Sequence, residues 1–134
     1  LQAGFGNIML KKIDKWNKIQ LNIAKHYSRN LKNLVEIPEY DLNISNPSFH
    51  QYIIKVKYRN KLKNYLKKNG IDTAIHYPIP IHRQKAFKKQ YGTIKLPKTE
   101  FYSNKILSLP INPYLKKREV DFIIKKIKQF YNES

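Results

Sequence analysis

Two histidines and a tyrosine lie close together in one short segment of the chain, GIDTAIHYPIPIHRQ. His76, Tyr77 and His82 carry imidazole and phenol groups, which donate and accept hydrogen bonds, and imidazole also changes charge near neutral pH. Pro78 and Pro80 fix the backbone φ and lack an N–H, so they hold the segment extended and outside a central strand. A stiffened loop of this kind presents polar groups at small entropic cost, and we expect it to contact a ligand.

Other kinds of reactive site find little support in the sequence. A zinc site needs several ligands that converge on one point. The chain has no cysteine to supply a thiolate, the carboxylate nearest to the loop histidines is that of Asp72, and the next histidine, His50, lies well before them. GxSxG, GxGxxG and Walker motifs are absent. We therefore predict no metal site, no hydrolase-type nucleophile and no phosphate-binding loop. The simplest alternative to ligand contact is that the histidines bind only backbone or water within their own loop.

The length and composition are those of one folded domain. The chain has 134 residues, of which 41% are hydrophobic, and its ten Tyr and six Phe residues supply bulky core side chains. No apolar run approaches the roughly 18 to 20 residues that a membrane-spanning helix requires, and no signal-peptide core is present. The lack of cysteine excludes disulfides. We expect a cytoplasmic protein with no membrane contact.

The formal net charge of +18 comes almost entirely from lysine, because the arginines are limited to Arg29, Arg59, Arg83 and Arg118. Proteins that read bases and phosphates in a bidentate manner preferentially use arginine. We therefore interpret the charge as a lysine-rich solvated surface. It should give weak, salt-dependent and sequence-blind binding to nucleic acid, and it should attract small polyanions such as nucleotide diphosphates.

Hydrophobic periodicity predicts the elements that must position the loop. Apolar residues at three- and four-residue steps indicate amphipathic helices over 1–34 and 116–131, and β-branched and aromatic residues indicate strands over 48–57 and 71–76. The other expected elements are an edge strand within 36–46, helices over 59–69, 84–90 and 98–105, and an apolar stretch over 106–109. This order predicts an α+β domain, in which helices pack on a small, mainly antiparallel sheet of about three strands.

The beginning of the chain indicates a fragment. Leu1 is not a methionine, and no capping residue precedes the first amphipathic helix. Gly4 and Gly6 each weaken this helix by about 1 kcal/mol relative to alanine. We expect residues 1–134 to form a single domain whose larger companion domain lies N-terminal to Leu1. Without that companion, the apolar stripe of the first helix should favour self-association.

Seven short motifs follow one another along the chain. The first is LQA at the start, the second is KWN with a later Ala24 and Tyr27, and the third is FHQY in the first main strand. Next come the leucine pattern that ends in Gly70, and then HYPIPIH. The last two are Glu100 followed by LSLP and Pro113, and the apolar closing helix. In this order they resemble the C-terminal half of the DegT/DnrJ/StrS sugar aminotransferases. The chain departs from the family where Ile19 and Gln20 replace a usual arginine.

This resemblance implies an enzyme that depends on pyridoxal phosphate (PLP) and moves an amino group, usually from glutamate, to a nucleotide-linked keto-sugar for surface polysaccharide. The chain would be the C-terminal small domain of an aspartate-aminotransferase-like fold, within a homodimer. In that family the Schiff-base lysine and most cofactor contacts belong to the large domain, and no lysine here has a matching context. We expect PLP in the full-length parent, and neither bound cofactor nor activity in this fragment.

By the same resemblance, the HYPIPIH loop borders the sugar pocket. His76 and Tyr77 are expected to contact the sugar or its diphosphate, and His82 is expected to support the loop. Two alternatives remain open from the sequence. One is a stand-alone basic module that binds nucleic acid or acidic polymers, and the other is a non-catalytic remnant that serves dimerisation.

Overall fold

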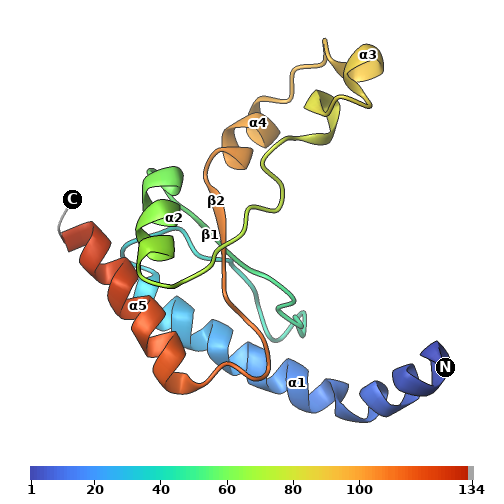
Figure 1. Cartoon of the computed structure of the whole chain (residues 1–134), viewed down its shortest axis with the longest axis vertical. Coiled ribbons are helices and arrows are strands. Elements are labelled where there is room, and N and C mark those ends of the chain that lie inside the picture. Colours follow the sequence, from blue (N-terminus) through green and yellow to red (C-terminus); the bar gives the residue numbers. More distant parts are fainter. Residues whose placement is uncertain (133–134) are drawn as a thin grey trace.

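The computed structural model describes residues 1–132, which form helices around a small sheet (Figure 1). In chain order, the elements are α1 (Gln2–Leu31), β1 (Tyr52–Lys55), α2 (Arg59–Lys68), the 3₁₀ helix η1 (Ile81–Arg83), α3 (Lys88–Tyr91), α4 (Pro97–Ser103), β2 (Ile106–Leu109) and α5 (Lys117–Asn132). This confirms the α+β class. None of the described helices is both long and apolar enough to cross a membrane.

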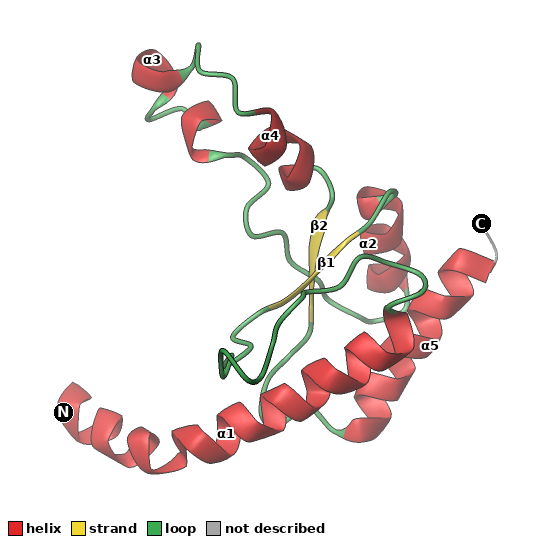
Figure 2. Cartoon of the chain, turned by 180° about the vertical axis from the view of Figure 1, so that it is seen from behind, coloured by secondary structure: helices red, strands yellow, loops and turns green. Residues whose placement is uncertain are grey.

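The two long helices, α1 and α5, pack side by side at one end of the molecule (Figures 1 and 2). The buried residues of α1 all lie in its C-terminal third: Ile23, Ala24, Tyr27 and Leu31. The predicted stripe of α5 is confirmed, since Val120, Ile123, Ile124, Ile127 and Phe130 are all buried. The N-terminal half of α1 projects away from the other elements, with apolar side chains exposed to solvent.

The sheet has two antiparallel strands, with Tyr52 of β1 opposite Leu109 of β2. Single bridges extend it on both sides, from Glu36 to Lys55 and from Ala74 to Ser108.

The strands expected within 36–46 and over 71–76 are therefore wrong as continuous strands. Pro38, two residues after Glu36, removes the next ladder donor of the first segment. The strand expected over 48–57 is also shorter, because Phe49 has a φ of 48°, which is not an extended conformation.

Aromatic and aliphatic side chains from α1, α2, α5 and the sheet form one core. At its centre the rings of Tyr27 and Tyr52 lie 5.1 Å apart. Their hydroxyl groups remain paired, because Tyr27 donates to the carbonyl of Pro110 at 2.9 Å and the Tyr52 hydroxyl bonds to Ser28 Oγ at 2.9 Å. Burial raises the pKa of Tyr52 to about 12. The core thus accommodates phenols without leaving their polar atoms unpaired.

The segment between the bridge at Ala74 and strand β2 leaves the core and returns to it as an extension, residues 75–105, which we call the arm (Figures 1 and 2). It carries η1, α3 and α4. The helix expected over 84–90 is wrong in extent, because η1 precedes it and α3 begins only at Lys88. At the base of the arm, Val56 N–H donates to the carbonyl of Lys105 at 2.9 Å, and buried Arg59 donates to the carbonyl of Ser103 at 3.3 Å.

Candidate substrate-binding groove

A groove of about 550 Å³ lies in the arm. One wall comes from the HYPIPIH loop, residues 76–82, and from η1. The other wall comes from α4 and the residues just before it. Most of the lining surface is apolar, and its aliphatic side chains include Ile79, Ile81, Ile94, Leu96 and Ile106. His76, Tyr77 and His82 all line the groove, so the structure brings together the three residues singled out from the sequence. No lysine or arginine belongs to this lining.

His76 is fixed from the strand behind it. Its Nδ1 lies 2.8 Å from Oγ of Ser108, a residue of β2 whose relative exposure is 6%. The backbone of Ser108 pairs with Ala74 in both directions, at 2.8 and 3.2 Å, so one residue holds both the start of the loop and its imidazole. Because the proton on imidazole can sit on either nitrogen, the Ser108 hydroxyl can donate or accept. The other ring nitrogen, Nε2, has no hydrogen-bond partner within residues 1–132.

Tyr77 extends from the same loop toward solvent. Its relative exposure is 70%, and its ring makes an edge contact with His76 at a centroid distance of 5.7 Å. A phenol in this position can donate or accept a hydrogen bond without giving up a partner in its own chain. Tyr77 and Nε2 of His76 are therefore the groups of the loop best placed to meet a polar ligand.

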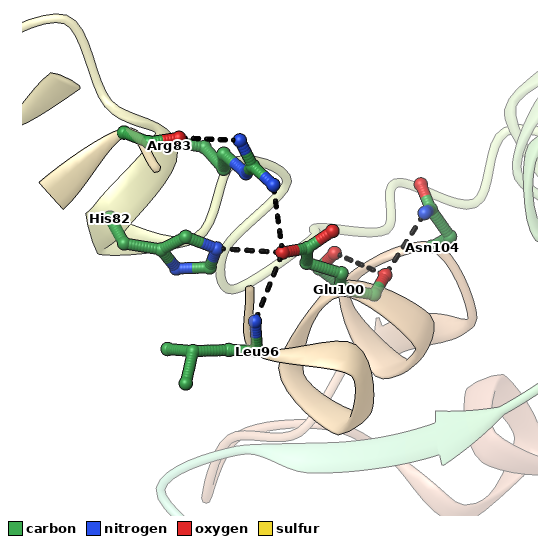
Figure 3. Close-up of polar contacts among 7 residues, drawn as sticks. His82, Arg83, Leu96, Glu100 and Asn104 are labelled. Atoms are coloured by element: carbon green, nitrogen blue, oxygen red, sulfur yellow. Dashed lines mark hydrogen bonds and ion pairs between the residues drawn. The ribbon is translucent and has the colours of Figure 1, made fainter. Parts of the chain in front are cut away.

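His82 differs from the other two residues because it is buried, with 6% relative exposure, and faces Glu100. Its Nε2 lies 3.0 Å from Oε1 of Glu100, which comes from α4 (Figure 3). The same oxygen accepts hydrogen bonds from the Arg83 guanidinium at 3.1 Å and from the backbone N–H of Leu96 at 3.2 Å. These bonds from His82, Leu96 and Arg83 lower the pKa of Glu100 to about 2. The contacts fit the expected supporting role of His82, while a ligand contact of its own stays a prediction.

Sequence reasoning did not assign a site role to Glu100 or Ser108. A signal for Glu100 exists, since a carboxylate in the first turn of a helix that begins with Pro97 can accept a free backbone N–H. Its two side-chain partners, however, lie 17 and 18 residues away and cannot be paired by local rules. Ser108 gives even less signal in the sequence, since a serine within an apolar strand has no characteristic spacing to a distant histidine.

A smaller pocket, of about 290 Å³, is also lined by His76. His50, Asp72 and Thr73 line it together with His76 and Ser108. Although two imidazoles and a carboxylate border this pocket, no group of three or more histidine, cysteine, aspartate or glutamate residues among residues 1–132 could hold a metal ion. His76 thus borders both the groove and this second pocket.

Comparison with known proteins covers almost the whole chain. The family model described as the DegT/DnrJ/EryC1/StrS aminotransferase family matches residues 1–128. A pleiotropic regulatory protein of Geobacillus stearothermophilus is 32% identical over 98% of this chain and 36% of its own length. A dTDP-3-amino-3,6-dideoxy-α-D-galactopyranose transaminase of Aneurinibacillus thermoaerophilus is 30% identical over 97% of this chain and 36% of its own length.

Solved structures show the same relationship. DesV of S. venezuelae superposes with a TM-score of 0.91 and 29% identity over 96% of this chain and 35% of that protein. An aminotransferase of Brucella abortus gives a TM-score of 0.83 and 34% identity over 90% of this chain and 32% of that protein. The chain therefore spans about a third of the length of these relatives, and the aminotransferase fold expected from the sequence is confirmed. With the family model matched from residue 1 to residue 128, the chain belongs to the DegT/DnrJ/EryC1/StrS aminotransferase family.

Proposed function

We propose that this chain is the C-terminal domain of a PLP-dependent aminotransferase that moves an amino group from glutamate to a nucleotide-linked keto-sugar. The names of its relatives support this substrate class, since they include a transaminase for a dTDP-linked amino sugar and an aminotransferase for a UDP-linked oxo-glucuronate. The whole enzyme would act in the cytoplasm as a homodimer and supply an amino sugar for surface polysaccharide.

The observation that carries this proposal is the groove bordered by His76 and Tyr77. Its apolar walls suit the carbon face of a sugar or a base, while Nε2 of His76 and the Tyr77 hydroxyl can bond to sugar hydroxyl groups. Because neither lysine nor arginine lines the groove, a diphosphate would find no permanent compensating charge there. We therefore assign the sugar, and not the diphosphate, to these two residues.

PLP supplies the electron sink that allows an amino group to leave one carbon and join another. It requires an amine to bind its aldehyde and donors or cations to hold its phosphate. Neither the groove nor the smaller pocket beside His76 is lined by a lysine or an arginine. The residues of this chain that border the site do not fit PLP by themselves, and we place the cofactor-binding groups in the remainder of the protein.

Substitutions in the longer enzyme test the assigned contacts. In the His76→Ala and Tyr77→Phe variants, kcat/KM for the keto-sugar should fall about fivefold or more, because a neutral hydrogen bond contributes about 1 kcal/mol. The half-reaction with glutamate should stay near that of the parent in both variants, and so should the thermal stability of Tyr77→Phe. Stopped-flow measurements of each half-reaction separate the two substrates.

Two residues of this chain offer matched controls. His26→Ala removes an imidazole that bonds to Asp121 at 2.6 Å on the α1–α5 side, and Tyr114→Phe removes the hydroxyl of a tyrosine that is 75% exposed. Both controls should leave sugar kinetics unchanged. If His76→Ala and Tyr77→Phe destabilise the fold while sparing sugar turnover, the loop is structural and the assigned contacts are wrong.

A further inference from the structure

The arm lacks the feature that usually holds two walls of a groove together, which is a buried apolar core. Among residues 75–105, the buried side chains are those of His82 and Ser103, and both are polar. The large apolar side chains around the groove remain accessible, as shown by relative exposures of 53% for Ile79 and 66% for Ile81. The shape of the groove must therefore depend on polar contacts.

Those contacts converge on Glu100 (Figure 3). One side-chain oxygen, Oε1, accepts hydrogen bonds from His82, Arg83 and the N–H of Leu96. The main-chain oxygen of Glu100 accepts two more, from Ser103 Oγ at 2.9 Å and from Asn104 Nδ2 at 3.0 Å. Charge-assisted hydrogen bonds to a carboxylate are about twice as strong as neutral ones. A single residue thus connects η1 to both ends of α4.

The position of Glu100 relative to the groove gives this connection a function. His82 lines one wall, and Leu96 and Ser103 line the other, whereas Glu100 does not line the groove. The carboxylate therefore stands behind both walls and bonds to each. Arg83 extends the connection, since it also donates to the carbonyl of Gly92 at 2.9 Å, just after α3.

We propose that Glu100 is a positioning residue that fixes the spacing of the two groove walls and thereby sets the affinity of the enzyme for its sugar substrate. The kinetic part of this statement rests on the proposed function. A role limited to starting α4 is a weaker explanation. Such a role needs only the bond to Leu96 N–H, whereas η1 supplies two of the three donors to the carboxylate.

Two variants test this proposal. Glu100→Gln keeps the size and removes the charge, while Glu100→Ala removes all three side-chain bonds. Glu119→Gln is the matched control, because Glu119 also lies in a first helical turn and accepts a backbone N–H, that of Lys116 at 2.7 Å, but belongs to α5 and does not line the groove.

Hydrogen exchange on this chain measures how firmly the two walls are held. In both Glu100 variants, amides of residues 79–96 should exchange about tenfold faster or more, because charged hydrogen bonds are lost, while amides of α5 keep their rates. In the longer enzyme, KM for the keto-sugar should rise about tenfold, while the glutamate half-reaction is unchanged and Glu119→Gln behaves as the parent.

Three other results would each contradict the proposal or the function on which it rests. Unchanged exchange in residues 79–96 of Glu100→Ala overturns the proposal, whatever the enzyme does. Faster exchange with KM for the sugar within twofold of the parent also overturns it, because the arm then loosens without affecting the substrate. A parent enzyme that accepts no nucleotide-linked keto-sugar refutes the proposed function, and with it the assignment of Glu100 to sugar affinity.

Discussion

At the scale of single residues, the carboxylate of Glu100 makes the arm sensitive to acid. Hydrogen bonds from His82, Leu96 N–H and Arg83 lower its pKa from 4.5 to about 2. A carboxyl group with a lower pKa in the folded arm binds its proton more weakly there than in the unfolded chain. The stability that it contributes is therefore complete above about pH 4.5 and is lost as the pH falls towards 2.

We expect acidification of the chain to release the arm before the core. Amide and side-chain NMR signals of residues 79–96 should lose their dispersion between about pH 4.5 and pH 2, while those of α5 change later. Glu100→Gln should remove this separate step, because its side chain does not titrate in that window. A single transition shared by the arm and the core, unchanged in Glu100→Gln, would contradict this expectation.

The residues of the site were predictable where the signal was local. His76, Tyr77 and His82 occur within seven positions of one another around two prolines, and they do line one groove. Glu100 could not be assigned in this way, because its role appears only when α4 meets η1 in space. The carboxylate is ordinary in sequence and becomes informative through its donors.

At the scale of elements, the end of α2 shows how one backbone conformation stops a helix. Gly70 has a φ of 75°, its N–H donates to the carbonyl of Lys67 at 3.0 Å, and Ile71 N–H donates to the carbonyl of Leu66 at 2.9 Å. These two bonds form a Schellman motif, in which buried Ile71 follows the helix and buried Leu66 lies in its last turn. The turn directs the chain toward Ala74 and the arm.

Gly70→Ala should destabilise the chain by about 1 kcal/mol, because an L-residue is strained in the left-handed region. Steric contact adds nothing, since no atom lies within 4 Å of the position of a new Cβ. Urea unfolding measures the loss. Gly4→Ala is the control, because Gly4 has the same open surroundings but lies inside α1. The Gly4→Ala variant should raise the helicity measured by circular dichroism. An equal shift of the urea midpoint in both variants would contradict the role of the left-handed backbone at Gly70.

The same contrast explains which elements the sequence predicts well. Helices α1, α2 and α5 follow from local periodicity and stop signals, and the structure places them within a few residues of expectation. The sequence predicts strands around Glu36 and Ala74 only from the local residue types. Pairing is decided by partners far along the chain, and Pro38, two residues after Glu36, removes the next ladder donor of that segment.

At the scale of the whole molecule, the N-terminal half of α1 presents an uncovered apolar surface. Phe5 has a relative exposure of 66%, Ile8 has 56% and Met9 has 53%. Isolated apolar side chains on a surface are ordinary, but a contiguous stripe along a projecting helix is commonly covered by another protein surface. The net charge of +18 opposes close approach of two copies elsewhere, and added salt weakens that repulsion.

We expect this chain to form a dimer or a higher oligomer through α1, and to do so more readily as the salt concentration rises. Light scattering across a concentration series measures the mass. Phe5→Lys should shift the chain toward monomer, because it places a charge in the stripe. Phe122→Lys is the control on α5, where the ring is 44% exposed. A parent chain that stays monomeric at high concentration would refute this expectation.

The base of the arm has a further consequence for how this protein can diversify. The outgoing chain at Ala74 and the returning chain at Ser108 are hydrogen-bonded neighbours, so the two ends of the excursion are fixed by the sheet and not by what lies between them. Doubling the length of a flexible connection between fixed ends costs only about 0.6 kcal/mol. Insertions, deletions and exchange of the segment between related genes can therefore reshape the groove while the framework keeps folding, and the arm forms a unit on which selection can act separately.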